Sequence, residues 1–252
     1  NVNVSCLDSA PAQGAPQTVT LQGYVKLFSS GNDSAGVKVE VFKEGANGAL
    51  GDLIGTAIVT SNDDAKNPPL NPKPEWLKKC PSGGCIFRSY KYEGIPTETR
   101  LIIKTSDATA NGLNWSDVYD YNIYFANSAV SNGAVTYDVT AAASTDINTV
   151  ASAAGGFTIR PDKGVLAGEV HDCGDVRLSG VTVDTDLPHE ADIFYFGDNE
   201  ADPLPDKTRT KEGTSTLGLF GALNLPTGTP VKVSAVGKVG GQLTLIGTQV
   251  VQ

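Results

Sequence analysis

The sequence predicts an all-β protein made of two tandem antiparallel β-sandwiches joined by one short helix. Two observations support this prediction. Several segments alternate apolar and polar residues with period two, a pattern that buries one face of a strand and exposes the other. Three sequence landmarks also occur twice in the same order. The 252 residues, of which 40% are apolar, suit two domains of about 100 to 150 residues each.

The duplication rests on three pairs of similar segments. The pairs are Leu21–Val25 with Leu166–Val170, Gly36–Val41 with Gly180–Asp184, and Ile95–Thr99 with Leu225–Thr229. The distance from Gly36 to Pro96 is 60 residues, against 46 from Gly180 to Pro226. We therefore expect an insertion near residues 61–86 of the first copy, where proline-rich polar sequence is best tolerated on the surface.

Strands and one helix follow from these patterns. The expected strands are Val37–Phe42, Leu101–Lys104, Asp120–Phe125, Val181–Asp184 and Val231–Ser234. A helix is expected over Ser144–Ala154, where Ser144 or Thr145 can cap it and apolar residues recur at helical spacing. The resulting domain plan has a tail (1–17), a first sandwich (18–138), a linker containing the helix (139–163) and a second sandwich (164–252).

Four cysteines and the beginning of the chain point to an exported protein. Cys80 and Cys85 bracket a short loop and are expected to form one disulfide, which leaves Cys6 and Cys173 for each other. Binding of zinc is the alternative role for these thiols, but a second close cysteine pair is missing.

The chain starts at Asn1 and contains no Met, so we expect a mature product after signal-peptide removal, in an extracytoplasmic location.

A resemblance to a known family follows from the order of these motifs. Gly-x-Val, then Gly-Val-x-Val, then a Leu-Pro-x-Gly-Thr turn before a last strand resembles the transthyretin-like or carboxypeptidase-regulatory-like β-sandwich family, an Ig-like fold. The copy from Leu166 to Gln252 matches better, because Glu98 replaces the turn glycine in the first copy. The resemblance implies accessory, adhesive or structural modules and carries no catalytic residues.

The alanine-rich connection between the copies, with Gly164–Gly168 and Asp172–Cys173 opening the second, also resembles cell-surface lipoproteins of Gram-negative bacteria. This likeness implies a lipid anchor upstream of the chain or at Cys6, which follows the small Ser5.

Charge is distributed unevenly along the chain. With 19 Lys and Arg against 28 Asp and Glu, the net charge is −9, which argues against nucleic acid as a partner. No apolar stretch is long enough to span a bilayer. Residues 169–206 contain eleven acids and one base, Arg177. Within them Asp198, Glu200 and Asp202 offer closely spaced oxygens suited to Ca²⁺, and a solvated acidic face is the alternative interpretation.

Catalytic patterns are weak. His171 and His189 are the two histidines, and neither lies in a hydrolase motif; Gly213–Leu217 lacks the second glycine of a nucleophile elbow. Paired carboxylates would permit glycoside hydrolysis only at a separation that the sequence does not define. We therefore expect a protein that is not an enzyme and that needs no cofactor, with Ca²⁺ as the exception to test.

Aromatic residues suggest a second function. Trp115, Tyr119 and Tyr121 lie close together in the sequence and could form a platform for stacking sugars, although such residues more often pack in a core. The sequence thus predicts an exported, non-enzymatic surface or envelope protein in adhesion, assembly or structure, whose partner is a protein or a second copy. The alternative is a carbohydrate-binding module with a glycan as ligand.

Overall fold

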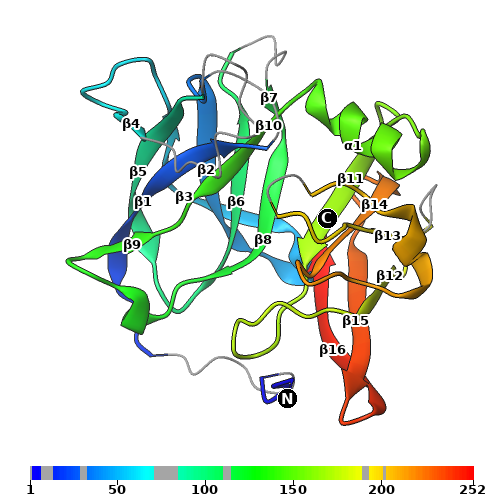
Figure 1. The fold of residues 1–252 in the computed structure, drawn as a ribbon. Helices are drawn as coiled ribbons and strands as arrows, with labels where there is room; N and C mark the ends of the chain where they lie inside the picture. The colour runs from blue at the N-terminus through cyan, green and yellow to red at the C-terminus, as the bar shows by residue number, and fades with distance from the viewer. Residues whose placement is uncertain are drawn as a thin grey trace. The chain divides into compact units, whose positions relative to one another are not determined.

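The computed structural model forms two compact units. It describes residues 2–6, 14–28, 33–70, 85–109, 115–188, 193–200 and 203–252. Module A comprises Ala12–Asp146, and module B comprises Ile147–Gln252 together with Asn1–Pro11. Strands dominate both modules, and the fold is an all-β sandwich, as the alternating pattern predicted (Figure 1).

Module A contains two sheets. The first has the strand order β4 (Pro69–Leu70), β5 (Phe87–Pro96), β1 (Thr18–Leu27), β10 (Val139–Ala143) and β7 (Trp115–Ser116), and β9 (Ala134–Thr136) also pairs with β1. The second has the order β3 (Leu50–Val59), β2 (Val37–Glu44), β6 (Arg100–Asp107) and β8 (Val118–Tyr124). The expected strands near residues 37, 101 and 120 are therefore confirmed.

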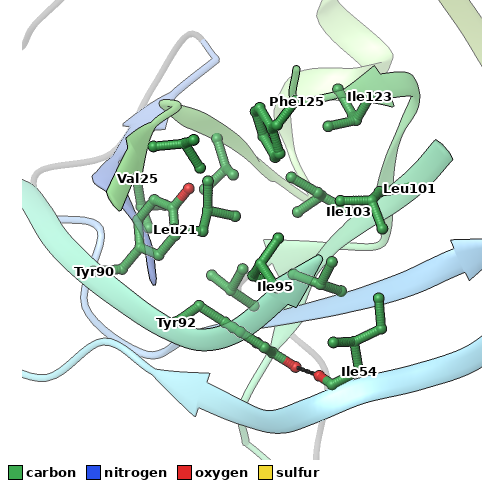
Figure 2. Close-up of a cluster of buried hydrophobic side chains, with 14 of the residues drawn as sticks. Leu21, Val25, Ile54, Tyr90, Tyr92, Ile95, Leu101, Ile103, Ile123 and Phe125 are labelled. Atoms are coloured by element: carbon green, nitrogen blue, oxygen red, sulfur yellow. Dashed lines mark hydrogen bonds between the residues drawn. The ribbon is translucent and has the colours of Figure 1, made fainter. Parts of the chain in front are cut away.

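The core of module A draws on both sheets. Leu21, Val25 and Tyr92 come from the first sheet, and Leu101 and Ile103 come from the second; all five are almost completely buried (Figure 2). Along β1 and β2 buried positions alternate with more exposed ones, because successive side chains point to opposite faces of a sheet. The Tyr92 hydroxyl donates to the Ile54 carbonyl at 2.5 Å, so the polar tip of this buried ring is satisfied.

Two strands of module A depart from the antiparallel arrangement that the sequence predicted. β9 and β10 both pair with β1 in parallel. After β8, in the second sheet, the chain crosses to the first sheet and follows β1 in the same direction, as a crossover connection requires. Val139–Ala143 is therefore a strand of module A and not part of a linker, which corrects the predicted boundary at residue 138.

Module B contains two smaller sheets. Their orders are β11 (Lys163–Glu169), β14 (Leu219–Pro226), β13 (Phe194–Tyr195), and β12 (Thr182–Thr185), β15 (Val231–Val239), β16 (Gln242–Val251). The order β11-β14-β13 corresponds to β1-β5-β4 of module A, and β12-β15-β16 corresponds to β2-β6-β8. The segments beginning at Gly36 and Gly180 thus lead into equivalent strands, which supports the duplication.

In each module a buried threonine makes the same hydrogen bonds to the backbone just before these equivalent strands begin. In module A the buried Thr60 hydroxyl donates to the Ser34 carbonyl at 2.6 Å and accepts from the Val37 amide at 3.1 Å. The Gly36 amide donates to the Thr60 carbonyl at 2.8 Å. We call this arrangement the threonine clamp.

In module B Thr214 makes the same four-residue arrangement with Leu178, Gly180 and Val181. Its hydroxyl donates to the Leu178 carbonyl at 2.6 Å and accepts from the Val181 amide at 3.1 Å. The Gly180 amide donates to the Thr214 carbonyl at 2.8 Å. Gly36 and Gly180 have φ values of +79° and +70°, a conformation that favours glycine, so both glycines serve the clamp.

The clamps also show where the copies differ in length. Thr60 lies 23 residues after Val37, whereas Thr214 lies 33 residues after Val181. Module B is therefore longer before its clamp threonine, and module A is longer after it, between Thr60 and β5. The latter segment is the predicted insertion near residues 61–86; residues 71–84 lie outside the described part of the chain.

A residue in left-handed conformation occupies the matched turns after β5 and β14. Glu98 has φ +53° and Gly228 has φ +69°. At Glu98 the side chain offsets the cost of this conformation: its carboxylate accepts from the Tyr124 hydroxyl and from the Asn127 amide, the latter at 2.7 Å. These bonds lower the pKa of Glu98, the Tyr124 bond most. Glu98, which replaces the turn glycine in the first copy, is thus stabilised in this turn by the hydrogen bonds of its own side chain.

The predicted helix is confirmed as α1 (Asp146–Gly155). Ala151, which is fully buried, packs with Phe194, Phe196 and Leu223 of module B. Since α1 packs on a sheet of module B, it belongs to that module's core, and the region predicted as a linker (139–163) is divided between the two modules.

We predict that Thr214→Val lowers the stability of module B by about 2–4 kcal/mol, because the isosteric side chain leaves a buried amide and a buried carbonyl without a partner. Thr214→Ser keeps the hydroxyl and should cost about 1 kcal/mol, for the lost methyl group. Thr56→Val on the exposed face of β3 is the control and should change stability by less than about 0.5 kcal/mol. Denaturant unfolding measures all three; equal losses for Thr214→Val and Thr56→Val would contradict the clamp.

Candidate functional site

A group of charged side chains in module B surrounds His171, just after β11. The His171 Nδ1 lies 2.6 Å from Asp175 Oδ1, and Nε2 lies 2.8 Å from Glu169 Oε1. Both ring nitrogens therefore face carboxylates, which favours the doubly protonated imidazolium. Partial burial lowers the pKa of His171, but the hydrogen bonds to Glu169 and Asp175 outweigh it and raise the pKa above its ordinary value of 6.5.

Arg177 extends this group. It pairs with Glu169 through Nε, and its Nη1 lies 2.8 Å from Glu200 Oε1. An isolated bridge joins the backbones of His171 and Arg177, so the two cations lie on adjacent segments and share one carboxylate between them. We call His171, Glu169, Asp175, Arg177 and Glu200 the histidine cluster.

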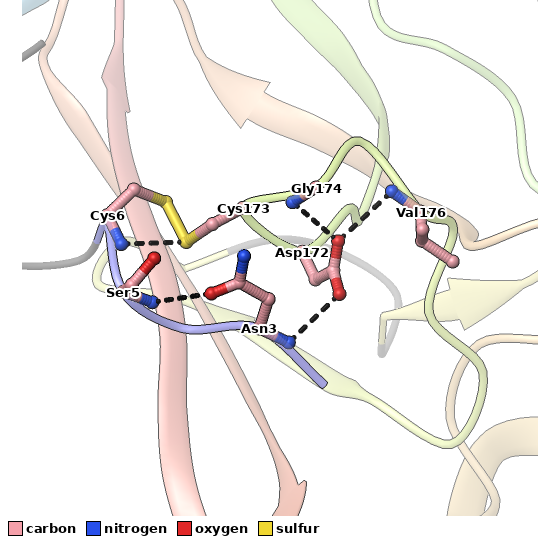
Figure 3. Close-up of a disulfide and its surroundings, with 7 residues drawn as sticks. All are labelled: Asn3, Ser5, Cys6, Asp172, Cys173, Gly174 and Val176. Carbon is pink, nitrogen blue, oxygen red and sulfur yellow. Dashed lines mark hydrogen bonds between the residues drawn. A yellow bond between two sulfur atoms is a disulfide. The ribbon is translucent and has the colours of Figure 1, made fainter. Parts of the chain in front are cut away.

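The turn inside the histidine cluster is fastened to the N-terminal segment (Figure 3). Cys173 forms the predicted disulfide with Cys6. The Asp172 carboxylate accepts from the backbone amides of Asn3 at 2.9 Å and Gly174 at 2.8 Å, and these bonds lower its pKa. The Cys173 amide donates to the Asn3 carbonyl at 2.8 Å.

Residues 2–6, which the sequence analysis assigned to a tail, are therefore part of module B. Because the Cys6 sulfur is bonded to Cys173, it is not available for a lipid thioether or for zinc, which corrects the expectation of an anchor at Cys6. The predicted Cys80–Cys85 disulfide involves Cys80, which lies outside the described residues.

The acidic side chains of residues 169–206, the acidic stretch, hold turns and loops together by hydrogen bonds. Each of its eight described acidic residues accepts at least one hydrogen bond. These residues are Glu169, Asp172, Asp175, Asp184, Asp186, Asp198, Glu200 and Asp206. Asp206, for example, caps the 3-10 turn Lys207–Lys211 by accepting from the Thr208 amide and hydroxyl, and these bonds lower its pKa. The described acids therefore hold local structure, and several of them also face solvent, such as Asp175, whose side chain is 92% exposed.

The candidate Ca²⁺ ligands are engaged in different interactions. Asp198 accepts from the Thr216 hydroxyl at 2.5 Å and from the Thr216 amide at 2.8 Å, which lowers its pKa, whereas Glu200 pairs with Arg177. Asp202 lies outside the described residues. Within the part of the chain that the structure describes, no three His, Cys, Asp or Glu side chains are grouped so as to hold a metal ion.

The aromatic candidates separate in the structure. Trp115 is 8% exposed and belongs to the core of module A, so it does not contribute to a surface platform. Tyr119 and Tyr121 are half-buried on one face of β8, with ring centroids 6.5 Å apart. Lys104 Nζ lies 5.1 Å from the centre of the Tyr119 ring and 2.7 Å from the Asp117 carboxylate. A two-ring surface remains where three rings were predicted.

Sequence reasoning missed an almost buried arginine in module A. Arg88, 4% exposed on β5, binds Asp33 through two parallel bonds, Nε–Oδ1 at 2.8 Å and Nη2–Oδ2 at 2.6 Å. It also pairs with Asp64, and its pKa is raised, chiefly by the Asp33 bond. Arg88 thereby joins the segments before β2 and after β3 to the first sheet. An isolated arginine in an alternating strand carries no sequence signal of such a pairing.

No protein-family model matches the sequence, and no curated protein matches it either. Among the described residues, no helix is long and apolar enough to cross a membrane. The disulfide is typical of proteins that fold in an oxidising compartment.

The histidine cluster predicts a pH dependence. Because the folded-state pKa of His171 is raised, its stabilisation is complete below about pH 6.5, the usual pKa of histidine, and is lost as the pH rises through the folded-state value. We expect the melting temperature of module B to fall over this pH range, and His171→Gln to remove that fall. Replacing the other histidine, which lies outside the described residues, is the control: His189→Gln should leave the fall in place. An NMR titration that gives His171 a pKa at or below 6.5 would contradict the prediction.

Proposed function

We propose that this is an exported, non-enzymatic protein of a cell surface or envelope, where it acts in adhesion, assembly or structure. The observation that carries the proposal is that polar and charged side chains hold the loops and turns at the ends of the strands. The Arg88 pairs, the Glu98 turn, the histidine cluster and the other described acids each hold a loop or turn at the end of a strand. Firmly held loops on a sandwich are suited to presenting a surface to another molecule.

Modular construction supports the same proposal. The two modules share their strand order, their threonine clamp and the left-handed residue of one turn. These shared features support the duplication. On our proposal both modules are transthyretin-like sandwiches, whose usual role is accessory, adhesive or structural. The Cys6–Cys173 disulfide supports an extracytoplasmic location.

The proposal is tested in the source cells. Protease added to intact cells should digest the protein without lysis, and cells lacking it should adhere less well or have a weakened envelope. Reintroducing the wild-type chain should restore the phenotype. Resistance to protease until lysis, together with normal adhesion and envelope integrity in the deletion strain, would refute the surface role.

Carbohydrate binding is the second candidate, because Tyr119 and Tyr121 lie side by side on an edge strand next to the Lys104–Asp117 ion pair. Aromatic faces and adjacent charged groups are common in sugar sites. On this hypothesis Tyr121→Ala lowers the affinity for a glycan found by array screening at least about fivefold, or ~1 kcal/mol. Tyr24→Ala on β1, another half-buried tyrosine, is the control. Equal affinities for the wild type and Tyr121→Ala would exclude this surface.

A further inference from the structure

The strand β16 lies at the edge of its sheet. Among the described strands it pairs with β15, and its other side faces no further strand. The backbone amides and carbonyls along such an edge are available to pair with an added strand. At ten residues, β16 is among the longest strands in the chain.

This edge lacks charged residues and proline, two features that usually prevent strand addition. From Gln242 to Gln252 there is no Asp, Glu, Lys, Arg or Pro. Leu243 is 75% exposed and Leu245 is 48% exposed, and because they are two residues apart they share one face of the strand. The bulge in β16 occurs beyond them, where Ile246 is the extra residue between Leu245 and Gly247, so Gln242–Leu245 remains a regular strand.

The edge strand β3 of module A shows the contrast. It has two register shifts along its pairing with β2, a glycine at φ +63° (Gly55) and a charged residue (Asp52). It also exposes two leucines, Leu50 and Leu53, to a similar degree as Leu245. Irregularity and charge of this kind prevent edge-to-edge pairing. Exposed leucines alone therefore do not distinguish β16. Its edge differs because it is uncharged and because it is regular over Gln242–Leu245.

We propose that β16 joins two copies of this chain by antiparallel edge pairing, which extends each three-stranded sheet into a continuous six-stranded one. The inference deepens the assembly role proposed above and rests on it. A two-fold axis through Thr244 places Leu243 of each copy opposite Leu245 of the other. The four leucines then form one cross-strand patch, and such pairs stabilise sheets.

The register about Thr244 is self-complementary, which points to a second copy as the occupant, and charge permits it. Two chains of net charge −9 repel each other, so a contact between copies has to avoid the acidic stretch. β16 is uncharged, and its neighbour β15 carries Lys232 and Lys238 but no acid. This sheet edge is therefore a place where two such acidic chains can approach closely without opposing carboxylates.

Sedimentation velocity on the purified full chain over a wide range of concentrations tests the pairing. We expect a monomer–dimer equilibrium, and the variant Leu243→Lys with Leu245→Lys should raise the dimer Kd at least about tenfold, or ~1.4 kcal/mol. The matched control is Leu50→Lys with Leu53→Lys on β3, which should leave the Kd unchanged. All four leucines are exposed, so both variants should retain the melting temperature. A wild-type chain that is monomeric throughout, or equal effects of the two variants, overturns the proposal.

Hydrogen exchange locates the contact. Peptides covering Gln242–Leu245 should exchange more slowly as the protein concentration rises, whereas peptides covering β3 should not change. Concentration-dependent protection elsewhere with none at β16 overturns the proposal. If the chain stays monomeric and a synthetic peptide of residues 242–252 slows exchange at β16, two copies do not pair there and the edge accepts a strand from another protein.

The two proposals fail separately. A monomeric protein found on the cell surface overturns pairing at β16 and leaves the surface role standing. A dimer formed through β16 by a protein that surface protease does not reach retains the pairing and refutes the surface role.

Discussion

Each sandwich depends on satisfying the backbone groups where the chain enters its second sheet. Thr60 and Thr214 do this with a single hydroxyl that donates to one carbonyl and accepts one amide inside the core. An unpaired buried amide or carbonyl would cost about 1–3 kcal/mol, a large part of the stability of a typical domain. Because the clamp fixes where β2 and β12 begin, it also fixes which of their side chains face the core.

The charged residues act in the same way at the ends of the strands. Arg88 gathers two segments of module A onto β5, and the acids of module B cap turns or pair with His171 and Arg177. A net charge of −9 would suggest a repulsive surface. Hydrogen bonds from backbone amides and hydroxyls stabilise these carboxylates in their charged form, and the lowered pKa values of Asp172, Asp198 and Asp206 follow from them. The β16 strand contains no charged residue, so its edge differs chemically from the acidic turns of module B.

The two modules differ most where a scaffold can vary without losing its core. Module A adds strands on the free side of β1 and extends the chain after Thr60, whereas module B extends the chain before Thr214 and takes up the N-terminal segment. Insertions between clamped strands cost little, since loop-closure entropy grows slowly with length. The shared strand order therefore persists although the sequences between the landmarks have diverged.

Local patterns are enough to predict the β class, the strands with period-two alternation, the helix near residue 146, the duplication and the Cys6–Cys173 pair, because each depends on local periodicity or on a small number of residues. Tertiary structure alone decided the parallel pairing of β9 and β10, the burial of Trp115, the Arg88 pairs and the partners of Asp198 and Glu200. These features join residues far apart in the chain, and no periodic pattern encodes which distant carboxylate or strand edge a given side chain will meet.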